Sequence, residues 1–349
     1  MKNYDNIIIG SGPAAYKFTA HATGSTLVIE GSTFGGICPN YGCEPKIFLD
    51  GSARAVLLSR KLIGKGIQQP ATIDWPTLMA RKLAVFGQYP RNSVKLFQSK
   101  GADVLQGTAK FVEPHVLDVN GTQYYGRSII IATGQQPHKL PIKGSEYTLS
   151  SNDVFVMQEL PERITMIGGG FVSMELASIL TAAGVQVDVL EAAKRPLGAF
   201  NPAHVEQIVR EMSAQGVQFH FNERVAAVNK MPTGFEVVTE NGLRVPANQV
   251  VDASGRVPNV ERLDLQKVGI TYSSHGISVN GHLETNVPGV YAAGDVIDKR
   301  VPKLTSTAQF EGEYLGRYLA SRTQAEIIYP TIAQAAFTFS TNCAGGSEH

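Results

Sequence analysis

The chain has 349 residues, enough for two or three domains of about 100–200 residues each. Its hydrophobic content of 43% and charged content of 17% are those of a globular protein and argue against disorder. Lysine plus arginine (31) nearly balance aspartate plus glutamate (30), so no charge surplus predicts binding to nucleic acid or to a membrane surface. Three cysteines are too few for a disulfide-stapled secreted domain.

No targeting or membrane-spanning segment is expected. The N-terminus runs directly into the apolar residues 7–9 without a signal-peptide pattern. The longest apolar region, residues 164–190, is interrupted by glycines and by acidic residues, whereas a spanning helix needs about 20 apolar residues in a row. We therefore expect a cytoplasmic protein with neither a membrane nor a nucleic-acid partner.

One pattern occurs twice along the chain. Near the start, an apolar strand enters the turn GSGPAA at residues 10–15, a helix-compatible stretch follows, and a second strand ends on Glu30. In the middle, a strand enters the turn GGGFVS at residues 168–173, a helix pattern follows, and the next strand ends on Glu191. The acid comes 20 residues after the first glycine in one copy and 23 residues after it in the other.

This repeated pattern is the fingerprint of a dinucleotide-binding βαβ fold. The first glycine allows a tight turn, the second lets the backbone approach a pyrophosphate, and the small third residue (Ala15 or Ser173) lets the helix pack on the strand. The helix N-terminus offers N–H groups to the phosphates, and the acid accepts hydrogen bonds from ribose hydroxyls. Two complete copies predict a protein that binds two dinucleotides.

Turn-rich segments divide the chain around the second copy. We expect crossings between two lobes at about residues 145–163 and 255–259, after which the stretch 263–319 returns to the first lobe. Between the two copies, the apolar periodicity predicts helices over about residues 47–63 and 75–99, with short β segments after them.

The segment GGICPNYGCEPK, residues 35–46, holds Cys38 and Cys43. A zinc site usually needs CxxC pairs and further ligands, so no metal site is expected. On a regular helix the two residues would be about 7.5 Å apart along the axis, too far for an unstrained disulfide, but a distorted helix start at Pro39 and Gly42 would close the gap. A helix N-terminus would also lower a thiolate pKa. The spacing leaves two interpretations open, a redox-active pair or two unrelated core cysteines.

This segment resembles the redox-active segment of the FAD-dependent pyridine nucleotide-disulfide oxidoreductases, the group with glutathione reductase, dihydrolipoamide dehydrogenase and mercuric reductase. The turn at residues 10–15 resembles the family's FAD fingerprint, and residues 168–175 resemble its nicotinamide-nucleotide fingerprint. The remaining resemblances follow in family order: ATG at 132–134, GRVPN at 255–259 and TNVPGVYAAGD at 285–295.

The resemblance implies an α/β fold with two Rossmann-like dinucleotide-binding domains, the NAD(P)-binding domain being inserted in the FAD-binding domain. We expect FAD-binding segments at residues 1–148 and 262–330 and an NAD(P)-binding domain at residues 149–261. Residues 331–349 would hold a vestige of the family's dimerisation domain and a tail.

The resemblance also implies the chemistry. NAD(P)H would reduce FAD, and FAD would reduce a Cys38–Cys43 disulfide that in turn reduces a small-molecule disulfide. Cys43 would lie against the flavin, Cys38 would attack the substrate, and Lys46 would lie near the flavin N5 atom, paired with Glu175. The cofactor-binding candidates are Gly10, Gly12, Pro13, Ala14, Ala15, Glu30, Gly36, Thr133, Gly134, Gly168, Gly170, Phe171, Glu191, Gly255, Arg256, Gly294 and Asp295.

The choice of nicotinamide and of substrate depends on nearby charges. Glu191 favours NADH over NADPH, because a carboxylate accepts hydrogen bonds from a free ribose 2′-hydroxyl and repels a 2′-phosphate. Lys194 and Arg195 follow closely and are able to bind a phosphate, so NADPH stays open. Glu44 puts a negative charge beside the cysteines where relatives usually have an apolar residue or threonine, so the sequence names no particular disulfide.

The chain departs from the family pattern near its C-terminus. The family forms a homodimer through a further domain whose His-Pro segment supplies an acid–base histidine, but the match fades at about residues 329–339 and none of the eight histidines precedes a proline. We expect residues 340–349 to be disordered. Two alternatives to disulfide reduction remain: a truncated flavoprotein with only diaphorase or NADH oxidase activity, or a non-catalytic flavin-binding redox module.

Overall fold

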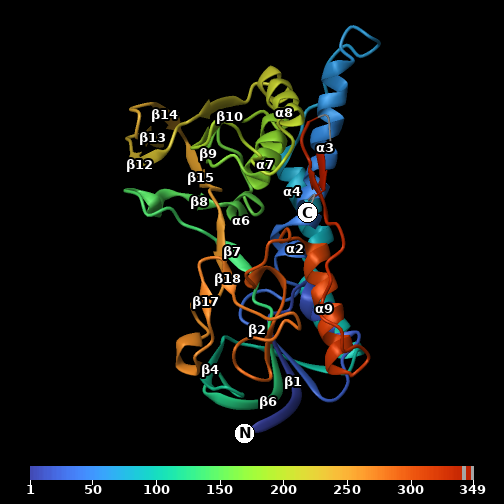
Figure 1. The fold of residues 1–349 in the computed structure, drawn as a ribbon. Helices are drawn as coiled ribbons and strands as arrows, with labels where there is room; N and C mark the ends of the chain where they lie inside the picture. Colours follow the sequence, from blue (N-terminus) through green and yellow to red (C-terminus); the bar gives the residue numbers. More distant parts are fainter. Residues whose placement is uncertain (340–342, 347–349) are drawn as a thin grey trace.

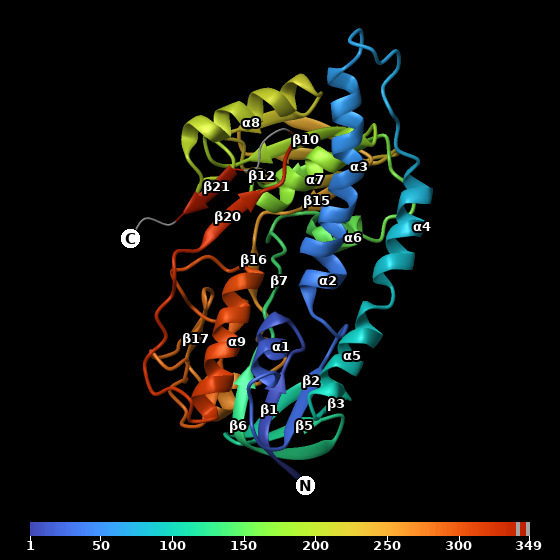
Figure 2. The same ribbon diagram turned by 90° about the vertical axis from the view of Figure 1, so that its right-hand side faces the viewer.

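The computed structural model describes residues 1–339 and 343–346. Two sheets, one mixed and one parallel, lie at opposite ends of an elongated α/β molecule, with the long helix α3 (Cys43–Lys61) beside one and α9 (Thr305–Leu319) beside the other (Figures 1 and 2). This architecture confirms the expected fold class of two Rossmann-like units. Among the described residues, no helix has the length and apolar character that crossing a membrane requires.

The first sheet has the strand order β3-β2-β1-β6-β5-β4, and β19 also pairs with β6. Its central strands are parallel and buried on both faces, which explains why their sequences are continuous apolar runs. Because β19 follows the second sheet in sequence, a late stretch of chain completes the first sheet. The strands are β1 (Lys2–Ile9), β2 (Thr26–Glu30), β3 (Ala102–Gln106), β4 (Ala109–Glu113), β5 (Val116–Val119), β6 (Thr122–Ile131) and β19 (Val290–Ala292).

Helices α1 (Pro13–Thr19) and α9 pack on each other with their backbones almost in contact. A Cβ atom added to Gly312 would lie 2.0 Å from the carbonyl oxygen of Ala14, and one added to Gly316 would lie 2.7 Å from that of Phe18. Glycine is therefore required at this crossing. The close approach holds α9 against the helix that follows the first glycine turn.

The second sheet is entirely parallel, in the order β11-β10-β9-β15-β8. Strand β9, helix α7 and strand β10 form the second βαβ unit, and a small antiparallel sheet, β12-β13-β14, is inserted before β15. The elements are β8 (Leu149–Ser150), α6 (Ser151–Val154), β9 (Arg163–Ile167), α7 (Phe171–Ala182), β10 (Gln186–Glu191), α8 (Pro202–Ala214), β11 (Gln218–Phe221), β12 (Val225–Lys230), β13 (Phe235–Thr239), β14 (Arg244–Ala247) and β15 (Gln249–Asp252).

The helices after the first unit differ from the predicted ones. The helix expected over 47–63 begins earlier, at Cys43, because Pro45 is tolerated in a first helical turn, and a five-residue helix, α2 (Ile37–Tyr41), precedes it. The helix expected over 75–99 is two helices, α4 (Trp75–Phe86) and α5 (Tyr89–Ser99). Gly87 ends the first, and Pro90 lies in the first turn of the second.

The strand pair β7–β16 joins the two lobes, β17–β18 lies in the stretch after it, and β20–β21 lies near the C-terminus. The strand β20 pairs antiparallel with β21, so the expected disorder of the tail is wrong for residues 343–346; the rest of the tail lies outside the described residues. These strands are β7 (Gln135–Pro137), β16 (Arg256–Pro258), β17 (Tyr272–Ser273), β18 (Gly276–Ile277), β20 (Ala333–Ala336) and β21 (Cys343–Gly346).

Candidate active site

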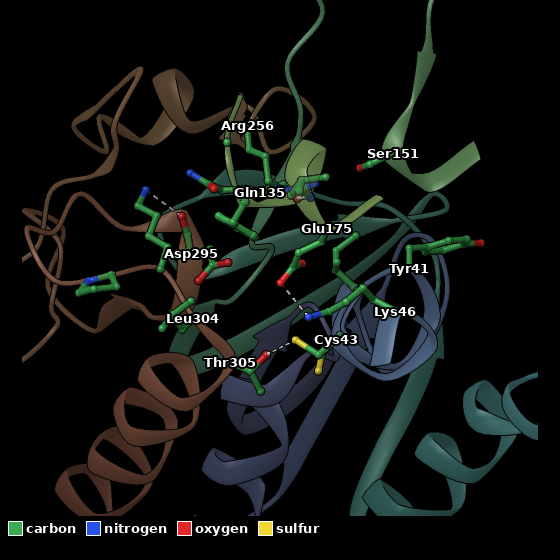
Figure 3. Close-up of a pocket in the computed structure, with 18 of the residues that line it drawn as sticks. Tyr41, Cys43, Lys46, Gln135, Ser151, Glu175, Arg256, Asp295, Leu304 and Thr305 are labelled. Atoms are coloured by element: carbon green, nitrogen blue, oxygen red, sulfur yellow. Dashed lines mark hydrogen bonds and ion pairs between the residues drawn. The ribbon is translucent and has the colours of Figure 1, made fainter. Parts of the chain in front are cut away.

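A cavity of about 870 Å³ is lined by both glycine turns, both cysteines and the start of α9 (Figure 3). The predicted site residues that line it are Gly12, Pro13, Ala14, Cys38, Cys43, Lys46, Gly168, Gly170, Phe171, Glu175, Glu191, Gly255, Arg256, Gly294 and Asp295. The predicted residues that do not line it are Gly10, Ala15, Glu30, Gly36, Thr133 and Gly134. No group of three or more His, Cys, Asp or Glu side chains in the described part of the chain is arranged to hold a metal ion.

The first glycine turn is tight and leaves open space at its second glycine. Gly10 has a φ of +105°, and a Cβ atom there would lie 2.3 Å from the carbonyl oxygen of Ala132. A Cβ atom on Gly36 would lie 2.8 Å from the Cα atom of Gly12, so the backbone leading to the cysteines rests on the turn. No atom lies within 4 Å of the Cβ position of Gly12, and no side chain caps the start of α1.

The second glycine turn repeats this geometry. Gly168 has a φ of +97°, and a Cβ atom there would lie 2.8 Å from the carbonyl oxygen of Ala253. The Cβ position of Gly170 is open, and no side chain caps the start of α7. Phe171, the first residue of that helix, is 47% exposed and lines the cavity.

The two acids also occupy matching places. Glu30 Oε2 accepts hydrogen bonds from the Ser11 amide at 3.0 Å and from its hydroxyl at 2.6 Å. Glu191 Oε2 accepts from the Gly169 amide at 2.5 Å, and its Oε1 accepts from the Ala193 amide at 2.7 Å. Each carboxylate is thus fixed at the end of its strand, beside the turn of its own repeat.

The cysteine pair lies at the distorted helix start that the sequence predicts. Helix α2 ends at Tyr41, Gly42 breaks the helical conformation, and α3 begins at Cys43. A Cβ atom on Gly42 would lie 3.2 Å from the Cα atom of Cys38, so the absent side chain lets the chain fold back. Both cysteines are free thiols in this structure, and the Cys38 thiol donates a hydrogen bond to the Cys43 sulfur.

This contact separates the acidities of the two thiols. The hydrogen bond from Cys38, the Thr305 hydroxyl 3.6 Å away and the charge of Lys46 together lower the pKa of Cys43 to about 6, against the opposing effect of burial. The same hydrogen bond and burial raise the pKa of Cys38 well above its usual range. Cys43, which lies between Thr305 and Lys46 in Figure 3, is therefore the thiol that ionises first.

A buried ion pair lies beside Cys43. The Lys46 ammonium is 2.9 Å from Glu175 Oε1, and the two side chains are 10% and 7% exposed. The Phe337 ring centroid lies 3.6 Å from the Lys46 ammonium, and the Phe337 amide donates to Glu175 Oε1 at 2.8 Å. Burial raises the pKa of Glu175, while the Lys46 charge opposes that rise. The C-terminal segment thus packs directly against the predicted Lys46–Glu175 pair.

A second buried network holds the turn at Asp295. The Gly294 amide donates to Glu311 Oε2 at 2.6 Å, and Gly294 has a φ of +81°. Glu311 is completely buried, and its Oε1 atom accepts from Lys299 at 2.6 Å and from the Tyr329 hydroxyl at 2.8 Å. Asp295 Oδ1 is buried and has no hydrogen-bond partner among the described residues.

These features fit FAD and a nicotinamide dinucleotide. Two uncapped helix starts beside open glycines match two pyrophosphates. The unpartnered oxygen of Asp295, which lines the cavity, matches a polar group of a ligand, because buried polar atoms normally have partners. The cavity volume lies in the range of cofactor sites.

Several cavity residues carried no motif in the sequence. Thr305, Lys303, Gln135 and Phe337 line the cavity but were not predicted. Thr305 follows the second FAD motif at the start of a helix, a position that gives a weak signal. The other three come from loops or short strands, and only the folded chain brings them to the cavity.

The chain is similar to known flavoenzymes. A family model described as pyridine nucleotide-disulphide oxidoreductase matches residues 4–312. The chain is 31% identical to a dihydrolipoyl dehydrogenase of Bacillus subtilis over 96% of its own length and 73% of that protein. It is 28% identical to a glutathione reductase of Nostoc over 96% of its length and 76% of that protein. It is 30% identical to a mercuric reductase of Lysinibacillus sphaericus over 89% of its length and 58% of that protein.

The stretch that the family model matches, residues 4–312, includes both glycine turns, both strand-end acids and both cysteines. The family model and the relatives agree with the expected use of FAD and of a nicotinamide dinucleotide. The chain belongs to the pyridine nucleotide-disulphide oxidoreductase family and is an FAD-dependent oxidoreductase.

Proposed function

We propose that the protein is an NADH-dependent disulfide oxidoreductase that works through FAD and a Cys38–Cys43 redox disulfide. The observation that carries this proposal is the cavity, onto which both thiols and both dinucleotide turns open. FAD, when bound, accepts a hydride from the nicotinamide and supplies two electrons to a disulfide. The residues of the chain bind the two cofactors, hold Cys43 at the cavity wall and determine which of the two thiols is protonated.

Cys43 is proposed as the thiolate that faces the flavin. Reduction of the internal disulfide adds two electrons and, above pH 6, one proton; Cys38 holds that proton, and its hydrogen bond stabilises the negative charge on Cys43. With a pKa of about 6, the Cys43 thiolate is present above pH 6 and is lost as the pH falls through that value.

Cys38 is proposed as the nucleophile toward the substrate. Once its proton is lost, its sulfur attacks one sulfur of the substrate disulfide, and the other substrate sulfur leaves with the bonding electrons and takes up a proton. The Cys43 thiolate then attacks Cys38, which re-forms the internal disulfide and releases the second substrate thiol. No histidine lines the cavity in the part of the chain that the structure describes, so we expect turnover to increase at alkaline pH.

We propose that Lys46, fixed by Glu175 and by the Phe337 ring, stands near the reacting edge of the flavin. The proposed substrate is a small disulfide without negative charge. Glu44 is exposed beside Cys43, and its charge raises the pKa of Cys38, so it disfavours an anionic partner.

The preference for NADH is supported by the residues after β10. Glu191 lines the cavity at the strand end, and we propose that its carboxylate accepts a hydrogen bond from a ribose hydroxyl. The Arg195 guanidinium donates to the carbonyl oxygens of Leu197 and Phe200 at 3.2 Å and of Gly198 at 2.9 Å. Because its donors are engaged by this loop, Arg195 is poorly placed to bind a 2′-phosphate.

The proposed domains are residues 1–148 with 262–330 for FAD and residues 149–261 for NADH. The pairing of β19 with β6 and the confinement of the second sheet to one continuous stretch of sequence support this division. Because the reaction consumes a nicotinamide coenzyme, we propose that the protein works in the cytoplasm.

Anaerobic titration of the purified holoprotein with NADH tests the proposed mechanism. We expect a yellow protein whose reduction by NADH produces a long-wavelength band from the Cys43 thiolate beside the flavin. Cys43→Ser should abolish this band with FAD still bound, whereas the matched change Cys38→Ser should keep a band.

Steady-state assays then identify the electron acceptor. NADH oxidation with lipoamide, with glutathione disulfide and with a dye should show a disulfide among the acceptors. A band that survives Cys43→Ser would contradict the role of Cys43. Reduction of the dye without any disulfide would favour a diaphorase instead.

A further inference from the structure

A lysine outside every recognised motif lines the cavity and is hydrogen-bonded at the Asp295 turn. Lys303 lies in the loop between the Asp295 turn and α9, and it lines the cavity. Its ammonium donates to the carbonyl oxygens of His275 at 2.7 Å and of Asp295 at 3.0 Å. An ammonium has three donors, so these two bonds fix its place and leave a third N–H.

The position of this loop is tied to the redox centre. Lys303 is two residues before Thr305, whose hydroxyl is 3.6 Å from the Cys43 sulfur. In Figure 3, Leu304, the residue after Lys303, lies between Asp295 and Thr305 at one side of the cavity. Lys303 and the Cys43 thiol therefore line the same cavity.

Lys303 differs from Lys46 and Lys299 in that no nearby carboxylate of the described residues forms an ion pair with it. Lys46 is neutralised by Glu175 at 2.9 Å, and Lys299 by Glu311 at 2.6 Å. In the described part of the chain, no carboxylate lies within ion-pair distance of Lys303. Burial lowers the pKa of Lys303, and the charge of Asp295 partly opposes this effect. A half-buried cation held by carbonyl groups alone is able to stabilise a new negative charge in the cavity.

We propose that Lys303 is a second cation of the flavin site, one that favours the reduced cofactor over the oxidised one. This inference rests on the proposed function, because hydride transfer adds one negative charge to bound FAD. A fixed cation in a site of low effective dielectric lowers the energy of the charged form more than that of the neutral form. Lys46 contributes less to this difference, since its charge is already paired.

The test compares two variants in each of which one lysine is replaced by neutral glutamine. Lys303→Gln removes the charge and keeps an N–H donor for a carbonyl group, while Lys65→Gln removes the same charge from an exposed position that does not line the cavity. For each holoprotein, the two-electron potential of FAD is measured against redox dyes. The affinity of each apoprotein for oxidised FAD is measured by flavin fluorescence.

We expect Lys303→Gln to weaken binding of reduced FAD about tenfold relative to oxidised FAD. That ratio corresponds to a potential about 30 mV more negative. Lys65→Gln should keep the parent potential. Lys303→Arg, which retains the charge, should restore most of the potential and also serves if the glutamine variant folds poorly.

Two outcomes would overturn the role of Lys303. One is a Lys303→Gln protein whose potential equals that of Lys65→Gln. The other is an equal loss of affinity for both forms of FAD, which indicates only a structural role. Failure of the parent protein to bind FAD or to be reduced by NADH would instead contradict the proposed function, and the two failures are therefore distinguishable.

Discussion

Thr305 contributes its hydroxyl to the cysteine pair through a contact between residues 262 positions apart in the sequence. Cys38, Thr305 and Lys46 all stabilise the Cys43 thiolate and so lower its pKa. Because a hydrogen bond to a charged group is stronger than one to a neutral group, the hydroxyl favours the ionised thiol. The acidity of Cys43 is thus a property of the assembled cavity and not of the CPNYGC segment alone.

Thr305→Val keeps the side-chain shape and removes the hydroxyl. We expect the midpoint pH of the Cys43 thiolate band to rise from about 6 by about 1, because a hydrogen bond to a charged group is worth about 1.5–3 kcal/mol. The measurement is a pH titration of the band in the NADH-reduced protein. The neighbouring change Ser306→Ala, also at the cavity wall, should leave the midpoint in place, and an unchanged midpoint in Thr305→Val would refute the contribution of its hydroxyl.

The sequence indicates residues of the site only where a motif repeats or carries special chemistry. Glycines, paired acids and closely spaced cysteines are recognisable because a turn, a ribose or a disulfide needs those residue types. Phe337 and Lys303 cannot be recognised in this way, because phenylalanine is common in protein cores and lysine is common on protein surfaces. Their place at the cavity results from the packing of loops that the sequence pattern does not determine.

At the scale of elements, the βαβ units are predictable because each unit is local. Their strands, turns and helices follow one another within about 30 residues, so periodicity and glycine position suffice. The break at Gly87 is harder to see because the apolar pattern continues through it into α5. The pairing of β20 with β21 is harder still to predict, since strands made mostly of alanine and glycine have little side-chain pattern.

The α1–α9 crossing offers a test with a matched glycine. In Gly312→Ala, the new Cβ atom would lie 2.0 Å from the Ala14 carbonyl oxygen, so the helices must separate. We expect a loss of about 1–3 kcal/mol in the free energy of unfolding together with weaker FAD retention, because α9 also carries Thr305 and Glu311. Denaturant unfolding and the flavin content of the purified variant measure the two effects.

Gly51→Ala is the control for that substitution. Gly51 lies within α3, and no atom is within 4 Å of its Cβ position. Alanine is the better helix former, so this variant should gain about 0.5–1 kcal/mol. The two glycine-to-alanine changes should therefore alter the free energy of unfolding in opposite directions. Equal effects would show that the close helix crossing is not the reason for glycine at position 312.

At the scale of the whole molecule, the two repeats serve one cavity from two lobes. Each lobe has its own sheet, glycine turn and strand-end acid, while the cysteines and the C-terminal segment lie between them. Glu30 and Glu191 each accept a hydrogen bond from a backbone amide of their own glycine turn but lie in different sheets. Because the internal repeat provides one such acid in each lobe, replacing the two acids one at a time distinguishes FAD binding from NADH binding.

Glu30→Ala and Glu191→Ala should affect different cofactors. Removing Glu30 should weaken FAD binding about tenfold, the effect of losing about 1.4 kcal/mol of hydrogen bonding, with little change in the KM for NADH of the FAD-loaded enzyme. Removing Glu191 should raise the KM for NADH by about the same factor and leave FAD bound. Because the repelling carboxylate is then absent, the ratio of kcat/KM for NADH over NADPH should also fall.

These two outcomes depend on the assignment of each sheet to one cofactor. Flavin fluorescence of the apoproteins and steady-state kinetics with both nicotinamides measure them on the same preparations. If Glu191→Ala instead released FAD, or Glu30→Ala changed only the use of NADH, the cofactors would be exchanged between the lobes. Cys43 would then face the wrong ring, because it belongs to the segment that rests on the first glycine turn through Gly36 and Gly12.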